Sequence, residues 1–531
     1  MESRRSFLQK TFVGVALLSL GNACKRSVQK IVLKMTGTKY TLGHRLWTKD
    51  FPKTSSEEKF KYVIVGAGIS GLSAARYLKR KGISDFLLVE LDEHIGGNSS
   101  NGENQYSKYP RGAHYLPLPN MEDADLITFL QEEKIIVSMK DGIPVFDEKQ
   151  LSFPPQERLF YRGNWQEDLV PKNENDSQSN KEFERFFDLM KAFRLKKDNV
   201  GLYWFDLPIS KASKVDEVVS LDKISMKEWL SQNNFVTEEL FWYVNYCCND
   251  DYGMGIDSIS AWAGIHYFAG RKQQDYKSNY KNNVLTWPEG NAHLVKLLGR
   301  YSDGHTRKNT IFFNIDFDKD NTVQLSVYDD ALKKSINLVC EKIILATPQF
   351  VNQYIFPNRK KISSAFTYAP WIVAAITLTG DLNGDTYSLA WDNVIYGSTG
   401  LGYVYDQQQD IKQINDVKVI SYYLPFPDKD VVKSRKKLYR QSAEYWKSAI
   451  INDLAKVHIG IEDTVMEIEI FKLGHGMISP VTGFRTSKER DAASKSFDNK
   501  VFFAHTDLSG ISVFEEGFYQ GIKAAKEMLN E

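Results

Sequence analysis

The segment from residue 61 to residue 97 constrains the fold of this chain more than any other part. It reads KYVIVGAGISGLSAARYLKRKGISDFLLVELDEHIGG. An apolar run at residues 62–65 is followed by a Gly-x-Gly-x-x-Gly turn, a helical pattern and a second apolar run at residues 86–89. This order is typical of a β-α-β unit in a Rossmann-like sheet that binds a dinucleotide. The alternative, a chance match in a structural turn, does not account for the second strand.

Each position of the glycine turn has a physical reason. Gly66 permits the tight turn, Gly68 lets the backbone approach a diphosphate, and Gly71 lets helix and strand pack closely. The helix begins at Ile69 and Ser70, where free N–H groups and the positive end of the helix dipole favour phosphates. We therefore expect these residues to bind the cofactor.

Glu90 ends the second strand, about 20 residues past the glycines, where a carboxylate accepts hydrogen bonds from ribose hydroxyls. An acid at this position, rather than an arginine, disfavours a 2′-phosphate and therefore NADP. The motif alone leaves FAD and NAD both open.

A second glycine pair, Gly96 and Gly97, follows this acid in the sequence LDEHIGGNSS. The arrangement resembles the flavin amine oxidase superfamily, which includes monoamine and polyamine oxidases, phytoene desaturases and protoporphyrinogen oxidase. The resemblance implies that the glycine pair and Asn98 help to hold FAD. Relatives usually carry an arginine at the position of Asn98, so one cationic contact to the phosphates is either missing here or supplied elsewhere.

The C-terminal segment, KVFFAHTDLSGISVFEEGFYQGIKAA from residue 500, reads as a strand, a polar turn and a helix. In relatives such a helix points its N-terminus at the flavin, and an acid of the turn contacts the ribityl chain. We expect Asp507, Gly510 and Phe514 to bind the cofactor, with Glu515 or Glu516 as the alternative acid. A helix N-terminus stabilises negative charge on the reduced flavin, although the same pattern also fits an ordinary strand–helix unit. No cysteine lies near this segment, so we expect FAD to be bound noncovalently.

Three further residues are candidates for catalysis. His475 lies between two glycines in a stretch that resembles the substrate-site wall of relatives, and an imidazole can take a proton near neutral pH. Residues 111–115 read RGAHY, and in relatives this turn passes beside the flavin. His114 and Tyr115 therefore either face the flavin or substrate, or are buried by packing while Gly112 makes a backbone contact.

One departure from the family affects the reoxidation of the flavin. Many amine oxidases have a lysine near flavin N5, on a strand that resembles residues 370–378 here. That stretch, PWIVAAITL, has no lysine. The electron acceptor is therefore left open between oxygen and another oxidant.

The chain has 531 residues, enough for two domains. We predict an α/β protein with a discontinuous Rossmann-like FAD-binding domain and an inserted α+β substrate domain. The predicted FAD-binding domain comprises residues 59–160, 284–350 and 470–531. The predicted substrate domain comprises residues 161–283 and 351–469.

Three shorter expectations concern secondary structure. Residues 25–58 read as a basic, extended linker, and residues 172–181 read as a solvated loop. Residues 438–454 read as one long amphipathic helix. Each of these is a prediction from composition and periodicity alone.

The N-terminus predicts export. Residues 1–24 contain Arg4 and Arg5 before a short apolar run, which resembles a twin-arginine signal, and this route carries folded proteins that already hold their cofactor. Cys24 follows small residues, so lipid modification, plain cleavage and a retained N-terminal anchor all stay open. We expect a periplasmic or cell-envelope protein that uses the twin-arginine machinery, with a lipid anchor at Cys24 as the one membrane contact that stays open.

Composition excludes some classes of function. The net charge is +1 and lysines are spread evenly, so no nucleic-acid partner is expected. Only four cysteines occur, without metal-ligand spacing, and Cys247 and Cys248 are expected to be thiols.

The sequence is compatible with three alternative functions. The leading one is an amine-oxidase-like enzyme that transfers a hydride from a C–N or C–C bond of a small substrate to FAD. The others are a desaturase or isomerase of an apolar isoprenoid-like substrate, and a flavin-binding assembly protein without turnover. A neutral or acidic cavity rich in Tyr and Trp would favour amines, a long apolar tunnel would favour the desaturase, and a closed pocket would favour the assembly protein.

Overall fold

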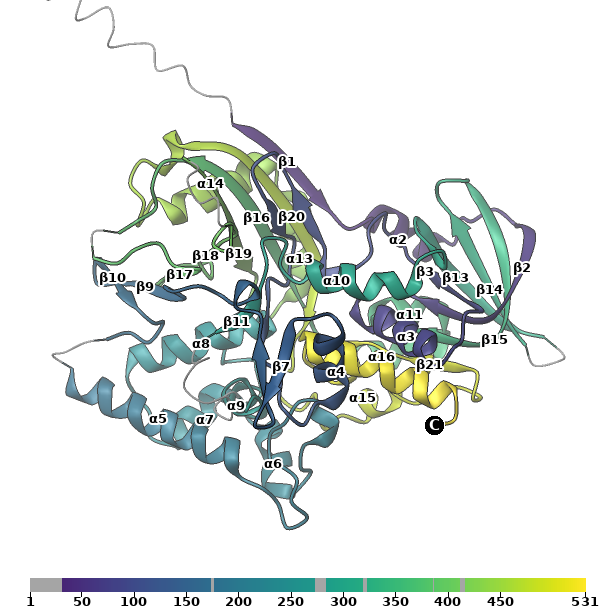
Figure 1. Cartoon of the computed structure of the whole chain (residues 1–531), viewed down its shortest axis with the longest axis horizontal. Helices are drawn as coiled ribbons and strands as arrows, with labels where there is room; N and C mark the ends of the chain where they lie inside the picture. The colour runs from purple at the N-terminus through teal and green to yellow at the C-terminus, as the bar shows by residue number, and fades with distance from the viewer. Residues whose placement is uncertain (1–30, 173–175, 273–282, 319–321, 385, 411–415) are drawn as a thin grey trace, which may run out of the picture.

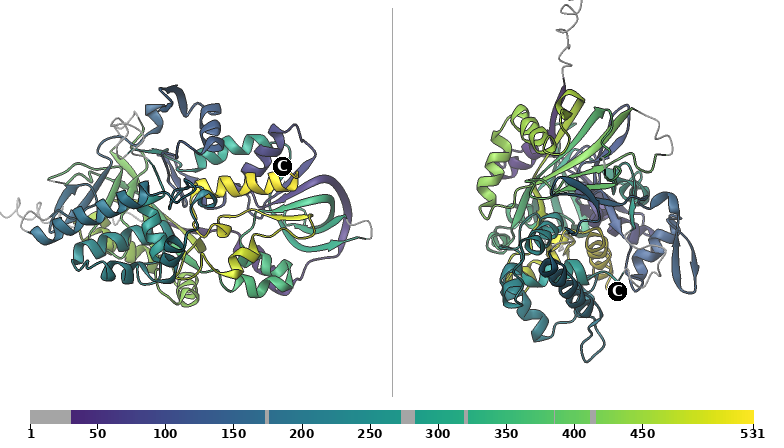
Figure 2. Two further views of the ribbon diagram at one scale, coloured as in Figure 1. Left: turned by 90° about the horizontal axis from the view of Figure 1, so that it is seen from below. Right: turned by 90° about the vertical axis from the view of Figure 1, so that its left-hand side faces the viewer.

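The structure is a computed structural model, and it describes residues 31–172, 176–272, 283–318, 322–384, 386–410 and 416–531. Figure 1 shows two bodies side by side: a sheet with helices on the right, and a larger sheet above a group of helices on the left. The chain passes between them several times, as the colours in Figure 2 show. The predicted discontinuous α/β architecture is therefore confirmed.

The right-hand body is the Rossmann-like sheet. β2 (Thr54–Val65) pairs in parallel with β3 (Phe86–Val89) on one side and with β15 (Lys334–Leu345) on the other, as the glycine motif predicts. The strands run in the order β12 (Thr306–Arg307), β3 (Phe86–Val89), β2 (Thr54–Val65), β15 (Lys334–Leu345), β14 (Val323–Asp329) and β13 (Thr310–Phe317), with β21 (Val501–Phe503) also on β15. β13, β14 and β15 are antiparallel, so the sheet is mixed.

Two helices far apart in sequence cover this sheet. α3 (Ile69–Arg80) follows the glycine turn, and α16 (Phe514–Met528) lies against it. A side chain at Gly521 would begin 2.0 Å from the carbonyl oxygen of Ser70, so the glycine allows this close approach. The C-terminal segment therefore returns to the dinucleotide-binding body, as predicted.

The left-hand body is built on an eight-stranded sheet. Its order is β1 (Val32–Gly37), β20 (Val465–Ile478), β16 (Tyr368–Thr379), β19 (Val417–Pro425), β18 (Tyr403–Tyr405), β17 (Asp392–Ile395), β9 (Glu157–Tyr161) and β10 (Asn164–Glu167). Its helices are α5 (Ser177–Leu195), α6 (Asp216–Ser220), α7 (Met226–Gln232), α8 (Glu238–Tyr252), α9 (Ala261–Ala269), α13 (Val431–Arg440) and α14 (Ala443–Leu454). Cys247 and Cys248 are buried free thiols of α8, as expected.

Smaller elements connect the two bodies. The paired strands are β4 (Asn101–Glu103) with β5 (Lys108–Pro110), β6 (Tyr115–Pro117) with β11 (Val284–Thr286), and β7 (Ile136–Lys140) with β8 (Ile143–Phe146). Further helices are α4 (Ala124–Glu132), α10 (Ala292–Gly299), α11 (Gln349–Ile355), α12 (Lys360–Ser363) and α15 (Lys488–Ala493).

The predicted linker is wrong where the structure describes it. Residues 32–37 form β1, which pairs in parallel with β20, and α2 (Tyr40–Thr48) follows. Leu42 and Leu46 of α2 are buried in the core beside the Rossmann sheet, and this burial stabilises the helix despite its polar sequence. The domain boundary drawn at residue 470 also falls inside β20.

Two other boundaries differ from the sequence-based expectation. The helix expected at residues 438–454 is broken at Gln441–Ser442, because the Ser442 hydroxyl accepts a hydrogen bond from the Tyr445 amide and starts α14 anew. Residues 177–181, expected as loop, belong to α5, whose N-terminus the Asp176 carboxylate caps. Residues 173–175 of that predicted loop lie outside the described residues.

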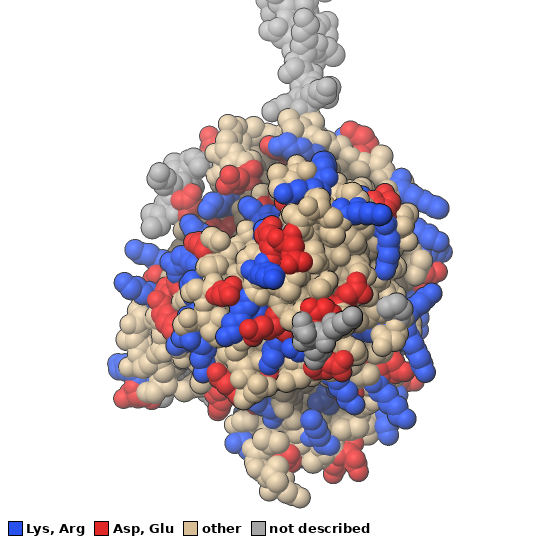
Figure 3. Space-filling view, turned by 90° about the vertical axis from the view of Figure 1, so that its right-hand side faces the viewer, with Lys and Arg blue, Asp and Glu red and all other residues tan. Residues whose placement is uncertain are grey.

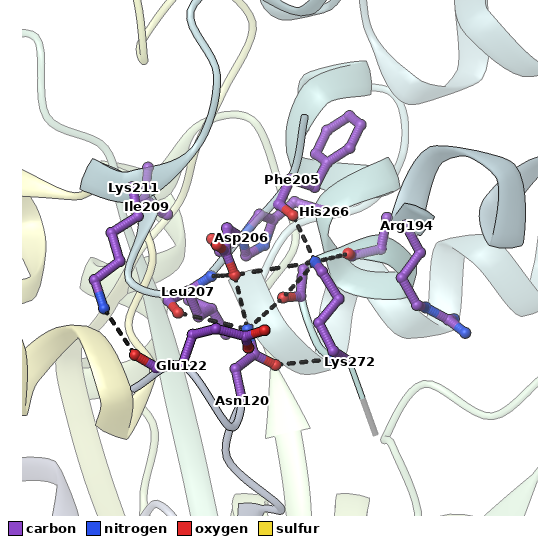
Figure 4. Close-up of polar contacts among 12 residues, drawn as sticks. Asn120, Glu122, Arg194, Phe205, Asp206, Leu207, Ile209, Lys211, His266 and Lys272 are labelled. Carbon is purple, nitrogen blue, oxygen red and sulfur yellow. Dashed lines mark hydrogen bonds and ion pairs between the residues drawn. The ribbon is translucent and has the colours of Figure 1, made fainter. Parts of the chain in front are cut away.

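A buried polar cluster holds the two bodies together (Figure 4). Asn120 donates to the Asp206 carboxylate at 2.9 Å and accepts from the Lys272 amide at 2.7 Å. The Lys272 ammonium in turn donates to the Phe205 carbonyl oxygen at 2.6 Å. These bonds fix the loop after β6 against the inserted helices.

The outer surface carries both signs of charge. On the face shown in Figure 3, acidic and basic side chains are interspersed. Within the described part of the chain, no helix is long and apolar enough to cross a bilayer.

Candidate active site

A cavity of about 1180 Å³ lies between the glycine turn and the ends of β16 and β20. Most of the predicted cofactor residues line it. They are Gly66, Gly68, Ile69, Ser70, Glu90, Gly96, Gly97, Asn98, Asp507 and Phe514. His475 lines the same cavity, whereas His114 and Tyr115 do not. The structure therefore brings together segments that are more than 400 residues apart in sequence.

The three motif glycines have different surroundings. Gly66 has a φ of +99°, in the region that favours glycine, and a side chain at Gly71 would begin 1.8 Å from the Gly66 carbonyl oxygen. At Gly68 no atom lies within 4 Å of the position a Cβ would take. Gly66 and Gly71 are thus required by the fold, while Gly68 leaves space in the cavity.

Two other glycines that we expected to bind the cofactor, Gly112 and Gly510, do not line the cavity. A side chain at Gly112 would begin 2.2 Å from the Asn98 carbonyl oxygen, so Gly112 lets two loops cross. Gly510 has a φ of +89° and lies close to the ring of Phe484. Both glycines are explained by backbone geometry.

Glu90 is oriented by backbone amides. One carboxylate oxygen accepts from the Ala67 amide at 2.7 Å and the other accepts from the Asp92 amide at 2.8 Å. Burial raises the pKa of Glu90 to about 7. The remaining lone pairs of this carboxylate can accept hydrogen bonds from the hydroxyls of a ribose in the cavity.

Asp507 is the acid of the C-terminal segment that reaches the cavity. Its Oδ2 accepts from the Gln349 amide at 2.7 Å and from the Tyr368 hydroxyl at 2.5 Å. Its Oδ1 lies 2.9 Å from Nδ1 of His505, but that nitrogen accepts from the Asp507 amide, so Oδ1 has no donor among the described residues. The alternatives Glu515 and Glu516 do not line the cavity, because they bind Arg271 and the Ile209 amide.

The residues of this cavity fit FAD. The gap at Gly68 and the free N-terminus of α3 suit a diphosphate, and Glu90 suits a ribose. The buried Oδ1 atoms of Asp507 and Asn291 line the cavity, have no donor in the part of the chain that the structure describes, and suit the hydroxyl and N–H groups of a ribityl-flavin. In the described residues, no cluster of His, Cys, Asp and Glu could hold a metal ion.

His475 forms part of the cavity wall. Its ring stacks on Phe350 at 4.0 Å between centroids and meets Tyr368 edge to face. Burial and the nearby Arg435 guanidinium lower the pKa of His475 to about 3. The imidazole is therefore neutral and a weak base, and its role in catalysis stays a prediction.

A second, smaller cavity of about 60 Å³ adjoins the first through the RGAHY turn. Arg111 and Ala113 line the large cavity, whereas His114 and Tyr115 line the small one. Tyr423 donates from its hydroxyl to the Gly112 carbonyl oxygen at 3.0 Å and also lines the small cavity. The turn is thus a shared wall.

Three carboxylates face this small cavity: Glu157 of β9, Asp250 of α8 and Asp392 of β17. Among the described residues, none of the three has a cationic partner within 4.0 Å; the nearby Arg271 pairs with Asp251 and Glu515 instead. The rest of the wall is mainly aromatic. It comprises Tyr115, Tyr246, Tyr267, Trp391, Tyr403, Tyr423 and His114.

Burial and mutual repulsion keep these carboxylates from ionising easily. The pKa of Asp250 is raised to about 8 and that of Glu157 to about 7, in both cases mainly by burial. The pKa of Asp392 is raised well above its usual range by burial and by Glu157 and Asp250. Strongly perturbed carboxylates around one cavity mark a functional site. Sequence reasoning missed them because they come from three distant segments that share no motif.

Comparisons with known proteins agree with this geometry. Residues 64–132 match the family model described as an NAD(P)-binding Rossmann-like domain. The chain is similar to a flavin-containing amine oxidase of Oncorhynchus mykiss, with 38% identity over 68 residues, which are 12% of this chain and 13% of that protein. It is also similar to polyamine oxidase 1 of Zea mays (51% over 37 residues, 7% of each chain). A carotenoid 3,4-desaturase of Haloarcula japonica is 29% identical over 121 residues, 23% of this chain and 22% of that protein. These alignments thus span less than a quarter of each curated relative.

Solved structures match over most of the chain. A putrescine oxidase bound to putrescine has a TM-score of 0.65 at 14% identity, covering 90% of this chain and 100% of that one. A cyclohexylamine oxidase of Brevibacterium oxydans has a TM-score of 0.64 at 15% identity, covering 89% and 99%. A fatty acid isomerase of P. acnes has a TM-score of 0.62 at 14% identity, covering 87% and 97%. The resemblance predicted from the sequence is thus confirmed in the dinucleotide motif and in the architecture, and the chain has the fold of the flavin-containing amine oxidases.

Proposed function

We propose that this protein is an FAD-dependent oxidoreductase that oxidises a C–N bond of a cationic amine. The observation that carries the proposal is the small cavity beside the one that fits FAD. It presents three carboxylates, Glu157, Asp250 and Asp392, that have no cationic partner within 4.0 Å among the described residues, within a wall of aromatic rings. Carboxylates and the faces of aromatic rings are the groups that bind an ammonium ion.

The same small cavity disfavours the second candidate function, a desaturase or isomerase of an apolar isoprenoid-like substrate. The fold does not decide, since a fatty acid isomerase shares it and a desaturase is similar in sequence. An apolar isoprenoid chain in this cavity would leave the three carboxylates without partners. Burying such groups without partners costs free energy. An ammonium group pairs with them instead. The third candidate function, a flavin-binding assembly protein, does not require an acidic cavity beside the cofactor.

The residues of the two cavities suggest how such a reaction proceeds. When bound, FAD supplies a hydride acceptor. The substrate ammonium favours the ionised form of these carboxyls, which hold it, and ionised Asp250, whose pKa is about 8, takes the proton that the ammonium must lose. His475 and His114, each with a pKa of about 3, are weaker bases. The substrate ammonium loses one proton and one hydride and becomes a protonated imine, which water hydrolyses to an aldehyde and an ammonium ion. Oxygen and another electron acceptor both stay open as the oxidant.

The proposal predicts which compounds reduce the flavin. Purified protein should be yellow and should release FAD on acid denaturation. Anaerobic mixing with primary amines should bleach the flavin absorbance, whereas isoprenoids should not. Bleaching by an isoprenoid alone would favour the desaturase, and the absence of bleaching by amines, amino acids and isoprenoids would favour the assembly protein.

We also propose that the protein is exported by the twin-arginine route, on the evidence of residues 1–24, which lie outside the described residues. Changing Arg4 and Arg5 to lysine should leave flavin-loaded protein in the cytoplasm, as measured by cell fractionation. Normal export of that variant would contradict the assignment. Palmitate labelling that disappears in Cys24→Ser would distinguish a lipoprotein from a cleaved, soluble protein.

A further inference from the structure

Charged side chains of both signs line the cavity that fits FAD. Four carboxylates line it, namely Glu90, Asp92, Glu93 and Asp507. FAD would add two negative charges at its diphosphate, and the turn that approaches this group carries no cationic side chain. The amide N–H groups at the start of α3 provide only partial positive charge. A cation from elsewhere in the fold is therefore expected at the diphosphate.

Asn98 does not provide the cation expected at the diphosphate. Asn98 is uncharged, and its side-chain amide donates to the Gly476 carbonyl oxygen at the end of β20. Arg111, another guanidinium in the wall, is held by Glu469 at 2.9 Å and 2.7 Å. Neither residue leaves a free positive charge for a ligand.

Arg435 of α13 is different. It lines the cavity and is half-buried, and its recorded hydrogen bonds go to the carbonyl oxygens of Gly474 at 2.6 Å and Tyr368 at 3.3 Å. No carboxylate within the described residues lies within 4.0 Å of its guanidinium. Burial without such a partner lowers the pKa of Arg435 from its usual value, although a guanidinium stays charged. Two carbonyl oxygens fix its orientation and leave N–H groups unused.

A series of contacts connects Arg435 with the glycine turn. Gly474 and Gly476 belong to the same end of β20, and Gly476 accepts from Asn98. Asn98 follows Gly97, where a Cβ would lie 3.6 Å from the Cα of Gly68. The end of β20 is thus joined to the loop that would face the diphosphate. The helix itself is held by buried Leu438 and by a Tyr439 ring that lies 4.7 Å from the ring of Tyr40.

We propose that Arg435 binds the diphosphate of FAD, so that the inserted domain supplies the cation that the Rossmann-like body lacks. This rests on FAD being the cofactor, as proposed above. Lys436 and Arg440 line the outer part of the same wall and add to its positive charge. Because α13 packs on β16 and β20, the diphosphate joins the two bodies of the protein.

The test compares R435M and R435K with K433M, a control on the same helix whose side chain is exposed and does not line the cavity. The rate of FAD release from the holoprotein is measured by the gain in flavin fluorescence. R435M should release FAD about tenfold faster or more, since charge-assisted hydrogen bonds to a phosphate are lost. R435K should lie between R435M and wild type, and K433M should match wild type.

A second measurement separates a phosphate contact from a structural role. ADP and adenosine are used to compete with FAD for the reversibly deflavinated protein. If Arg435 binds the diphosphate, the advantage of ADP over adenosine should shrink in R435M by about the same factor as FAD binding. If R435M loses FAD while that advantage is unchanged, Arg435 only positions β20 and the proposal is wrong. It is also wrong if R435M behaves as wild type in both measurements, whereas a wild-type protein without FAD would refute the proposed function itself.

Discussion

We expect the triple variant E157Q/D250N/D392N to lose at least about a hundredfold in kcat/KM for a cationic amine. A bound ammonium ion favours the ionised form of these carboxyls, so replacing them with amides removes an attraction worth several kcal/mol, and each 1.4 kcal/mol is a factor of about ten. The substitutions keep the size of each side chain, so the cavity keeps its shape. Anaerobic flavin reduction per bound flavin, compared with D188N at an exposed aspartate, measures the effect.

Stability provides the control for this variant. The folded protein keeps Asp250 and Glu157 protonated up to about pH 8 and 7, whereas the unfolded chain ionises carboxyls near pH 4. The unfolded state therefore binds fewer protons, and wild-type stability falls as pH rises from about 4 to 8. The triple variant should show a smaller fall than wild type, because other buried acids such as Glu90 still contribute, and its Tm should exceed that of wild type at pH 8. A variant that is folded and reduced at the wild-type rate would show that the carboxylates do not bind the substrate.

Gly68→Leu should remove FAD almost completely without unfolding the protein. Gly68 has a φ of −73° and a ψ of −178°, which any residue adopts, and no atom lies within 4 Å of its Cβ position. The leucine side chain would instead occupy the space in front of the turn, where the diphosphate is expected. Flavin per chain, measured after acid denaturation, should fall to near zero, while the thermal unfolding curve of the apoprotein stays cooperative.

Substitution of Gly71, in the same turn, should have a different effect from substitution of Gly68. At Gly71 even the Cβ of alanine would begin 1.8 Å from the Gly66 carbonyl oxygen, so Gly71→Ala should lower the Tm as well as the flavin content. Gly68→Ala should retain more flavin than Gly68→Leu. Full flavin content in Gly68→Leu would mean that the cofactor does not pass over this turn.

The dinucleotide site could be predicted from the sequence because its parts are local. Strands at residues 86–89 and 501–503 form as expected, and the glycine turn lies where backbone geometry requires it. Each depends on periodicity and on a few residues close together in the chain. Asp507 also reaches the cavity, as the C-terminal pattern indicated.

The acidic cavity and the role of the N-terminal segment could not be predicted in this way. Glu157, Asp250 and Asp392 meet only after β9, α8 and β17 have been placed by tertiary packing. Residues 32–37 become a strand because β20 offers an edge to pair with, which no local pattern reveals. Tertiary contacts overrode local preference at these positions.

The central claim is that a C–N bond of a cationic amine is oxidised as the flavin is reduced. The product of a single anaerobic turnover tests it most directly: wild-type holoprotein is titrated with a primary amine, and the flavin absorbance and the products are measured together. We predict one aldehyde and one ammonium ion for each flavin bleached. Full bleaching with a product that keeps its C–N bond and gains a C=C bond would contradict the claim.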